Sequence, residues 1–239
     1  RSMKNPKAVI LKRELSAYFT SPVAYIVSGL FIVFSSFLFF AIFFLQNRAE
    51  LRQFFSNLPM LFAFFIPAIT MRLFSEERRN GSLETLLTLP VTSFDVVIGK
   101  YLAAFCFSLC MLVPTIAYVI TVFIFGKPDL GPLLGGYLGA VFLAASFSSI
   151  GLFASVVTKN QILSFFIAFA LCIVLALADS FLVFLPSPII GLLQYFSAGS
   201  HFTSISRGII DTRDIVYFVS ITAVFLTLTV KVLDTRRAG

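Results

Sequence analysis

The residues with the clearest capacity for chemistry lie in one polar region, 72–100, between apolar stretches. Its charged cluster consists of Glu76, Glu77, Arg78 and Arg79. Ser82 is expected to cap a short helix whose amino end Glu84 would stabilise, and Pro90 limits the length of that helix. The helix would expose Leu83, Leu86, Leu87 and Leu89. Leucines beside charges are typical of a docking element for a partner protein; the alternative is a helix that lies on the membrane face.

Other reactive side chains are isolated. Cys106 and Cys110 share a helical face and could hold a soft metal, but we expect them to fill apolar space. His201 is the single histidine, and a structural role is favoured for it over a pH-sensing or metal-binding role. Arg207 and Asp211 would form an ion pair if their segment is helical. The sequence therefore predicts no catalytic residue and no metal site.

The composition is that of a membrane protein. Of the 239 residues, 59% are hydrophobic and 12% are charged, and the mean hydropathy is +0.98. A soluble domain is about a quarter charged, so this chain has too few charges to cover a water-facing surface. This excludes a soluble enzyme, a disordered regulator and a nucleic-acid-binding module. We interpret the net charge of +7 as anchoring on the cytoplasmic side, with the lipid bilayer and no nucleic acid as partner.

The apolar runs that must position the polar region predict an all-α membrane protein with six transmembrane helices. The expected spans are 23–45, 54–73, 94–125, 131–158, 161–185 and 213–233. The prolines that predict a kink in the second span are Pro59 and Pro67. Ser93 with Asp95 is expected to start the third span, and Thr212 or Asp214 to start the sixth.

Helix breakers interrupt the stretch between the fifth and sixth spans. They are Pro186, Pro188, Gly191 and Gly199. A straight, lipid-exposed helix through these residues would leave backbone groups without hydrogen bonds in hydrocarbon. We therefore expect residues 187–206 to form short helices that enter the extracytoplasmic leaflet and return, rather than a seventh span.

The amino-terminal stretch 4–20 is expected to be a basic amphipathic helix that lies in the membrane interface. Its charged residues include Lys12, Arg13 and Glu14. It either anchors the chain or connects a cytoplasmic partner to the spans. An even number of spans places both termini on one side, and most of the 18 Lys and Arg residues then share that side. By the positive-inside rule this side is the cytoplasm.

Three stretches resemble the ABC-2 type permeases of ABC transporters. The first contains Glu77, Gly81, Ser82, Glu84, Leu86, Leu87 and Pro90. It is similar to the family signature E-x-x-x-G-[ST]-x-E-x-L-L-x-x-P. Residues 12–22 resemble the amino-terminal helix of these permeases. Residues 201–218 resemble the branch that contains gliding-motility permeases and permeases serving copper-site maturation of nitrous oxide reductase.

The resemblance implies that 1–239 is a single permease domain of the bacterial inner membrane, with 75–91 as coupling segment and 4–20 as connecting helix. It implies a second permease half, expected to be another copy of this chain, above a cytoplasmic ABC ATPase dimer. The implied coupling residues are Glu76, Glu77, Arg78, Arg79, Gly81, Ser82, Glu84, Leu86, Leu87 and Pro90, with Lys12, Arg13 and Glu14 on the connecting helix. On the same model Arg78, Arg79 and Glu84 bond the ATPase or the connecting helix. The implied contacts for an extracytoplasmic gate or a companion membrane protein are His201, Arg207, Asp211 and Arg213.

The sequence contains no ATP-binding P-loop. Its Gly-Lys pairs, Gly99-Lys100 and Gly126-Lys127, lack both the following Ser or Thr and the preceding glycine of that motif. ATP and Mg²⁺ would therefore bind to the partner ATPase, and we expect no cofactor in this chain. The chain is accordingly not expected to be an enzyme by itself.

Two functions remain open. One is an ATP-driven permease that exports an amphipathic, lipidic or polymeric substrate. The alternative is a force-transmitting or anchoring subunit of a motility or secretion complex that moves no substrate. A secondary carrier is disfavoured, because such proteins carry ionisable relays or broken helices at the membrane midplane.

Overall fold

The computed structural model describes residues 6–46, 51–83, 91–126, 128–178, 195–209 and 211–238. Within these ranges the chain forms helices and no β-strand. The helices are α1 (Pro6–Thr20), α2 (Pro22–Gln46), α3 (Arg52–Thr70), α4 (Ser75–Arg79), α6 (Ser93–Leu112), the 3-10 turn η1 (Val113–Thr115), α7 (Ile116–Phe125), α8 (Leu130–Val157), α9 (Gln161–Leu177), α11 (Ala198–Ser206) and α12 (Thr212–Ala238).

Within the described residues, 5 helical stretches are long and apolar enough to cross a membrane. They are Pro22–Ala41, Arg52–Arg79, Ser93–Phe125, Leu130–Val157 and Thr212–Arg237, and Gln161–Leu177 is a shorter apolar helix. Their outer surfaces are apolar as well: Tyr25, Phe37 and Phe44 of α2 are exposed. Large exposed aromatic side chains suit a lipid environment. The chain is therefore a multi-pass membrane protein.

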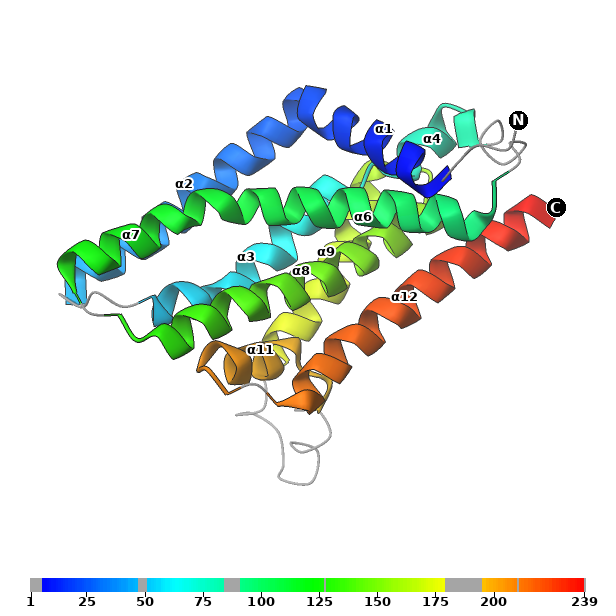
Figure 1. Ribbon diagram of the computed structural model, residues 1–239. Coiled ribbons are helices and arrows are strands. Elements are labelled where there is room, and N and C mark those ends of the chain that lie inside the picture. The colour runs from blue at the N-terminus through cyan, green and yellow to red at the C-terminus, as the bar shows by residue number, and fades with distance from the viewer. Residues whose placement is uncertain are drawn as a thin grey trace.

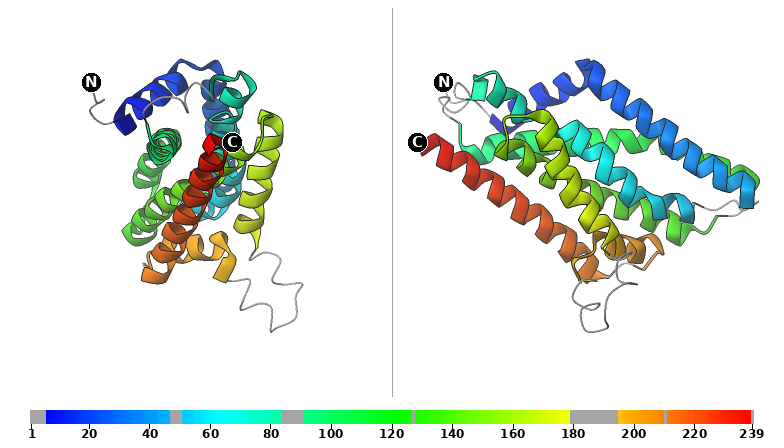
Figure 2. Two further views of the ribbon diagram at one scale, coloured as in Figure 1. Left: turned by 90° about the vertical axis from the view of Figure 1, so that its right-hand side faces the viewer. Right: turned by 180° about the vertical axis from the view of Figure 1, so that it is seen from behind.

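α8 lies at the centre of the bundle and contacts α3, α6, α9, α11 and α12 (Figure 1, Figure 2). Glycines on α8 allow α3 to approach closely. A Cβ atom at Gly136 would lie 2.4 Å from the Phe55 ring, and one at Gly151 would lie 2.0 Å from the Thr70 hydroxyl oxygen. Small residues permit such close helix packing in membranes. The contact between α3 and α8 is therefore fixed by residue size.

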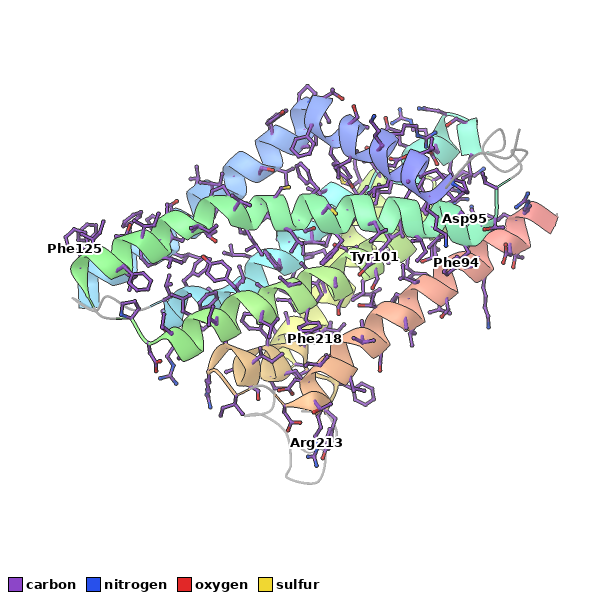
Figure 3. The ribbon with its side chains drawn as sticks, in the orientation of Figure 1. Phe94, Asp95, Tyr101, Phe125, Arg213 and Phe218 are labelled. Atoms are coloured by element: carbon purple, nitrogen blue, oxygen red, sulfur yellow. The ribbon has the colours of Figure 1, made fainter. Side chains whose placement is uncertain are left out.

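The bundle has two ends that differ in composition. At one end lie α1, α4, the start of α6 and the last turns of α12 (Figure 1). We call this end the terminal face, since it holds the first and the last of the described helices. α11 and the start of α12 lie at the opposite end, the distal face (Figure 1, Figure 2). Asp95 marks the terminal face and Arg213 the distal face (Figure 3).

Prolines act differently in two of the apolar helices. The 94–125 region is divided into α6 and α7 by the 3-10 turn that contains Pro114. Proline has no N–H for an α-helical hydrogen bond and clashes with the preceding turn, which explains the break. α3, in contrast, continues through both Pro59 and Pro67.

The expected start of the third span was wrong by one residue. Thr92, and not Ser93, caps α6: its hydroxyl accepts a hydrogen bond from the Asp95 N–H at 3.1 Å. The same hydroxyl donates to the Asp95 carboxylate at 2.7 Å. The capping side chain must precede the first helical residue in order to reach the free N–H groups of the first turn.

The expected start of the sixth span was also wrong. Thr212 and Asp214 both lie inside α12. The preceding residue, Asp211, accepts a hydrogen bond from the Arg213 N–H at 2.9 Å through its carboxylate. The carboxylate of Asp211 therefore satisfies the first turn, which leaves the Asp214 side chain free for another contact.

Several predicted segments lie partly outside the described residues. Of the expected fifth span, 161–185, the structure describes α9 and Ala178. Of the expected re-entrant segment, 187–206, it describes 195–206, which includes α11.

Candidate functional site

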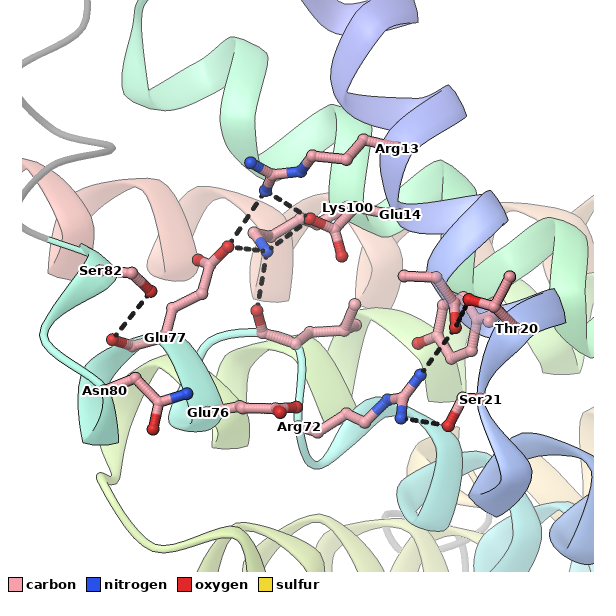
Figure 4. Close-up of a pocket in the computed structure, with 13 residues that line it drawn as sticks. Arg13, Glu14, Thr20, Ser21, Arg72, Glu76, Glu77, Asn80, Ser82 and Lys100 are labelled. Atoms are coloured by element: carbon pink, nitrogen blue, oxygen red, sulfur yellow. Dashed lines mark hydrogen bonds and ion pairs between the residues drawn. The ribbon is translucent and has the colours of Figure 1, made fainter.

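A buried lysine lies at the centre of the site on the terminal face. Lys100, on α6, is 1% exposed. Its Nζ donates to the Leu73 carbonyl at 2.8 Å, to Glu77 Oε1 at 2.9 Å and to Glu14 Oε1 at 3.0 Å (Figure 4). An ammonium group has three N–H donors, so all are used. The lysine thereby joins α1, the α3–α4 connection, α4 and α6.

Arg13 supplies a second positive charge beside the carboxylates of Glu14 and Glu77. Its Nη2 lies 2.6 Å from Glu14 Oε1 and 3.1 Å from Glu77 Oε1. Together with Lys100 these residues form a set of two cations and two anions, which we call the ion cluster: Arg13, Glu14, Glu77 and Lys100. Burying an unpaired charge costs several kcal/mol, whereas a balanced and hydrogen-bonded set loses less on leaving water.

Apolar packing holds α1 on α6 beside the ion cluster. A Cβ atom at Gly99 would lie 2.8 Å from Cγ2 of the buried Ile10, so glycine is needed for this approach. Tyr18 stacks on Phe107 of α6 with ring centroids 4.8 Å apart, and its hydroxyl donates to the Ile69 carbonyl at 2.9 Å. These contacts fix which face of α1 points to α6, and they direct its charged side chains into the ion cluster.

Arg72, after the end of α3, holds the corner between α1 and α2. It donates through Nη1 to the Ser21 hydroxyl at 2.5 Å and through Nη2 to the Ala17 carbonyl at 3.3 Å. Its guanidinium carbon lies 5.3 Å from the centroid of the Tyr18 ring, within range of a cation–π interaction. Arg72 therefore attaches the corner between α1 and α2 to the end of α3.

Burial and neighbouring charges change the titration of groups on α1. Burial alone would raise the pKa of Glu14, but the charge of Lys100 and hydrogen bonds from Arg13 and Lys100 hold it below its usual value. Burial alone would lower the pKa of Arg13, but Glu14 and Glu77 raise it through hydrogen bonds and charge. Burial raises the pKa of Tyr18. The ion cluster thus stabilises the charged forms of Glu14 and Arg13.

A cavity of about 500 Å³ opens beside the ion cluster (Figure 4). It is lined by Arg13, Glu14, Ala17, Tyr18, Thr20, Ser21, Arg72, Leu73, Glu76, Glu77, Asn80, Ser82 and Lys100. The second carboxylate oxygen of Glu77, Oε2, is buried and accepts no hydrogen bond from the described residues. A polar side chain that entered the cavity would find charged groups of both signs.

Basic side chains fix the same region to α8 and α12. Arg78 of α4 donates to the carbonyls of the last two residues of α8, at 3.0 and 2.7 Å. Arg236 of α12 donates to the Val157 carbonyl at 3.3 Å, and Arg237 donates to the Val91 carbonyl at 2.9 Å. Cations at a helix C-terminus bind its unpaired carbonyls and the negative end of its dipole. Arg78 therefore joins α4 to α8, and Arg236 joins α12 to α8. Arg237 joins α12 to Val91. We call these the arginine contacts.

The structure brings together only some of the predicted coupling residues. Arg13 forms ion pairs with both Glu14 and Glu77, so these three predicted residues lie in one cluster. Arg78 was expected to bond the ATPase or the connecting helix. Among the described residues it binds α8 and not α1, because α4 lies over the end of α8. The predicted residues that are exposed are Lys12, Arg13, Glu76, Arg79, Gly81 and Ser82.

The turn after α4 explains one glycine of the motif. Gly81 has φ of 72°, a left-handed conformation that suits glycine and ends the helix. The Ser82 hydroxyl donates to the Glu77 carbonyl at 3.4 Å, so it satisfies the end of α4. The rest of the helix that Ser82 was expected to cap lies outside the described residues. The predicted coupling residues outside the described part of the chain are Glu84, Leu86, Leu87 and Pro90.

The sequence prediction missed four basic residues of this site. They are Arg72, Lys100, Arg236 and Arg237. Lys100 carried a usable signal, since a lysine followed directly by a long apolar run needs a partner or access to water. Its carboxylate partners are 86 and 23 residues away in the sequence, so the pairing itself could not be read from spacing.

The predicted residues at the distal face do not form one cluster. His201 Nδ1 lies 2.6 Å from Asp214 Oδ1. The predicted ion pair between Arg207 and Asp211 is not formed between these described residues, because α11 ends at Ser206 and Gly208 turns the chain with φ of 85°. The predicted residues that are exposed here are Arg207, Asp211 and Arg213.

In the described ranges, no group of three or more His, Cys, Asp or Glu side chains could hold a metal ion. Cys106, Cys110 and Cys172 are free thiols, and Cys172 is buried. The arrangement on the terminal face is thus one of ion pairs and hydrogen bonds that join helices.

The family of the chain follows from its match to a family model. A model described as "ABC-2 family transporter protein" matches residues 24–231. No curated protein matches the chain at a significant level. The matched range contains Glu77 and Lys100, and it begins after α1, which supplies Arg13 and Glu14. The chain belongs to the ABC-2 family of transporter proteins.

Proposed function

We propose that this chain is the permease subunit of an ATP-driven ABC-2 type transporter. Membrane proteins of this family are permease components without an ATPase domain, and the family implies an ABC ATPase as partner. ATP and Mg²⁺ would bind to that partner, a dimer in the cytoplasm. With both chain termini in the cytoplasm of a bacterial cell, the terminal face would meet the ATPase.

The ion cluster carries this proposal. Glu77 belongs to the proposed coupling segment, 75–91, while Lys100 belongs to α6 and Arg13 and Glu14 belong to α1. Removing one partner from a buried ion pair costs about 3–5 kcal/mol. A push on α4 would therefore move α6 and α1 with it rather than separate the charges, and α1 leads directly into α2.

The arginine contacts supply a second route. Arg78 joins α4 to α8, and Arg237 joins the far end of the coupling segment to α12 through the Val91 carbonyl. Both ends of the segment are thus held by the bundle. Movement of the segment by an ATPase would reach α8 and α12 through these bonds while the ion cluster carries it to α6.

The assembly that we propose has two permease halves with six spans each. α9, extended to about residue 185, would supply the fifth span, and 187–206 would be the re-entrant segment. α2 and α12 expose apolar side chains that suit lipid or a second copy of this chain. A companion membrane protein at the distal face would fit the branch that contains gliding-motility and copper-maturation permeases.

Reconstitution tests the proposal. The full chain and the ATPase that copurifies with it are placed in liposomes, and ATP hydrolysis is measured with wild-type chain and with Lys100→Met. We expect the wild type to stimulate hydrolysis and to drive work across the membrane, and the variant to retain ATPase binding but lose the work. Absence of any ATPase from the purified complex would contradict the permease role.

The same liposomes separate the two open functions. Movement of a fluorescent lipid or dye that requires ATP supports export. ATP-dependent change in the external domain of a companion protein, without flux, supports the force-transmitting alternative. The ion cluster serves both, since each requires the spans to follow the ATPase.

A further inference from the structure

His201, the single histidine of the chain, bonds through both ring nitrogens. Its Nδ1 lies 2.6 Å from Asp214 Oδ1, on α12, and its Nε2 lies 3.2 Å from the Tyr195 carbonyl oxygen. Both partners are hydrogen-bond acceptors: the Asp214 carboxylate, when ionised, and the Tyr195 backbone carbonyl. A neutral imidazole has one N–H and can donate to one of them. With Asp214 ionised, both contacts are hydrogen bonds only when each nitrogen carries an N–H, that is, when the ring is an imidazolium.

We propose that His201 is a proton-binding site that ties the 195–196 segment to α12. When the ring holds a second proton, it donates to Asp214 and Tyr195 at once. We call His201, Asp214 and Tyr217 the distal latch. The inference concerns the distal face alone and does not depend on the proposed ATPase partner.

Tyr217 supports the same segment. Its ring stacks on the His201 ring with centroids 4.1 Å apart and an interplanar angle of 24°. Its hydroxyl donates to the Phe196 carbonyl at 2.6 Å. Two stacked rings from α11 and α12 thus hold two consecutive carbonyls, of Tyr195 and Phe196. Loss of the Nε2 proton would remove the hydrogen bond to the Tyr195 carbonyl and leave the one from the Tyr217 hydroxyl to the Phe196 carbonyl.

The His201 ring is open to a cavity, from which a proton can reach it, and a carboxylate beside it can neutralise the added charge. A cavity of about 690 Å³ opens beside it. Among the described residues, the other charged and titratable groups that line the cavity are Asp214, Arg213 and Tyr217 of α12, Asp211 before α12 and Tyr195. α11 contributes Ser200 and Ser204. The Asp214 side chain is 8% exposed, and its Oδ2 accepts no hydrogen bond from the described residues. A buried carboxylate with an unused oxygen favours a cation beside it.

Deprotonation would open the latch at one contact. The remaining N–H would stay on Nδ1, because a hydrogen bond to a carboxylate is stronger than one to a neutral carbonyl. The lone pair of Nε2 would then face the Tyr195 carbonyl oxygen, and two acceptors repel. The 195–196 segment would be released when the ring loses this proton, that is, as the pH rises.

Nuclear magnetic resonance on the full chain in lipid nanodiscs tests the proposal, since only one histidine gives a signal. With ¹⁵N-histidine, we expect hydrogen on both ring nitrogens at low pH and on one at high pH. Hydrogen exchange of the peptide that contains Tyr195 and Phe196, divided at each pH by its intrinsic base-catalysed rate, should accelerate with the same midpoint. Different midpoints, or exchange that does not change with pH, would overturn the proposal.

Variants supply the controls. His201→Gln should abolish the pH response of exchange at 195–196, whereas Arg213→Gln, which removes a charge from the same cavity, should retain it. Tyr217→Phe should raise exchange at every pH and leave a titrating histidine. A response that persists in His201→Gln would show that another group is responsible. If that variant does not fold, the comparison of midpoints in the wild type still decides.

Discussion

Lys100 Nζ lies 3.0 Å from Glu14 Oε1, although 86 residues separate the two in sequence. The lysine belongs to α6 and the glutamate to α1, so one buried hydrogen bond connects the amino-terminal helix to the third apolar stretch. Glu77 shares the same ammonium group. One ammonium group therefore joins α1, α4 and α6, and the first two expectations below follow from the strength of this contact.

Replacing Lys100 by Met should destabilise the terminal face. The change keeps most of the side-chain volume but leaves the carboxylates of Glu14 and Glu77 with Arg13 as their single cation. We expect a loss of about 3 kcal/mol in the free energy of unfolding, the lower end of the range for breaking a buried pair. Denaturant unfolding in lipid or detergent measures it. Lys12→Met removes an exposed charge from the same region and should change stability by less than about 1 kcal/mol; equal losses in both variants would argue against the ion cluster.

The stability that Glu14 contributes should depend on pH in one direction. Its folded pKa lies below the ordinary value of 4.5, so its contribution is fully present above that value and is lost as the pH falls through the folded pKa. Glu14→Gln should therefore be less stable than the wild type at pH 7. The difference should shrink below about pH 4, as the wild-type carboxylate takes up a proton. A difference that is the same at both pH values would contradict the assignment.

Arg237→Gln should weaken coupling more than it weakens folding. The substitution removes the hydrogen bond to the Val91 carbonyl, which is partly exposed, so the change in unfolding free energy should stay below about 1 kcal/mol. Work per ATP in the reconstituted complex should fall several-fold. Arg237→Lys keeps the charge and a donor and should recover part of it. Lys231→Gln, at an exposed position of the same helix, is the matched control, and a comparable loss there would remove the positioning role of Arg237.

Gly151→Ala should loosen the contact between α3 and α8. The added Cβ would meet the Thr70 hydroxyl oxygen at 2.0 Å and its Cβ at 2.8 Å, so the helices must separate. We expect a loss of about 1–3 kcal/mol, the usual cost of overpacking. Gly29→Ala on α2 has no atom within 4 Å of the new Cβ and should be neutral or mildly stabilising. Thermal unfolding of the two variants side by side gives the answer, and no difference between them would rule out size as the reason for the glycine.

The apolar helices could be predicted because their signal is local. Whether a segment suits hydrocarbon depends on the composition of about 20 consecutive residues. The apolar runs near α2, α3, α8 and α12 can be recognised from that composition alone. Helix starts were less predictable. Thr92 rather than Ser93 caps α6, because a difference of one residue decides which side chain reaches the free N–H groups.

By itself, the sequence determined the membrane class, the approximate helices and the family motif around Glu77 and Gly81, since each is written in neighbouring residues. The tertiary structure alone decided that Lys100 takes Glu14 and Glu77 as partners, that Arg78 turns to α8 and that His201 meets Asp214. Such choices depend on which helix faces come together. Helix packing follows from the size of residues such as Gly99 and Gly151 on surfaces far apart in the chain, and spacing along the sequence does not encode it.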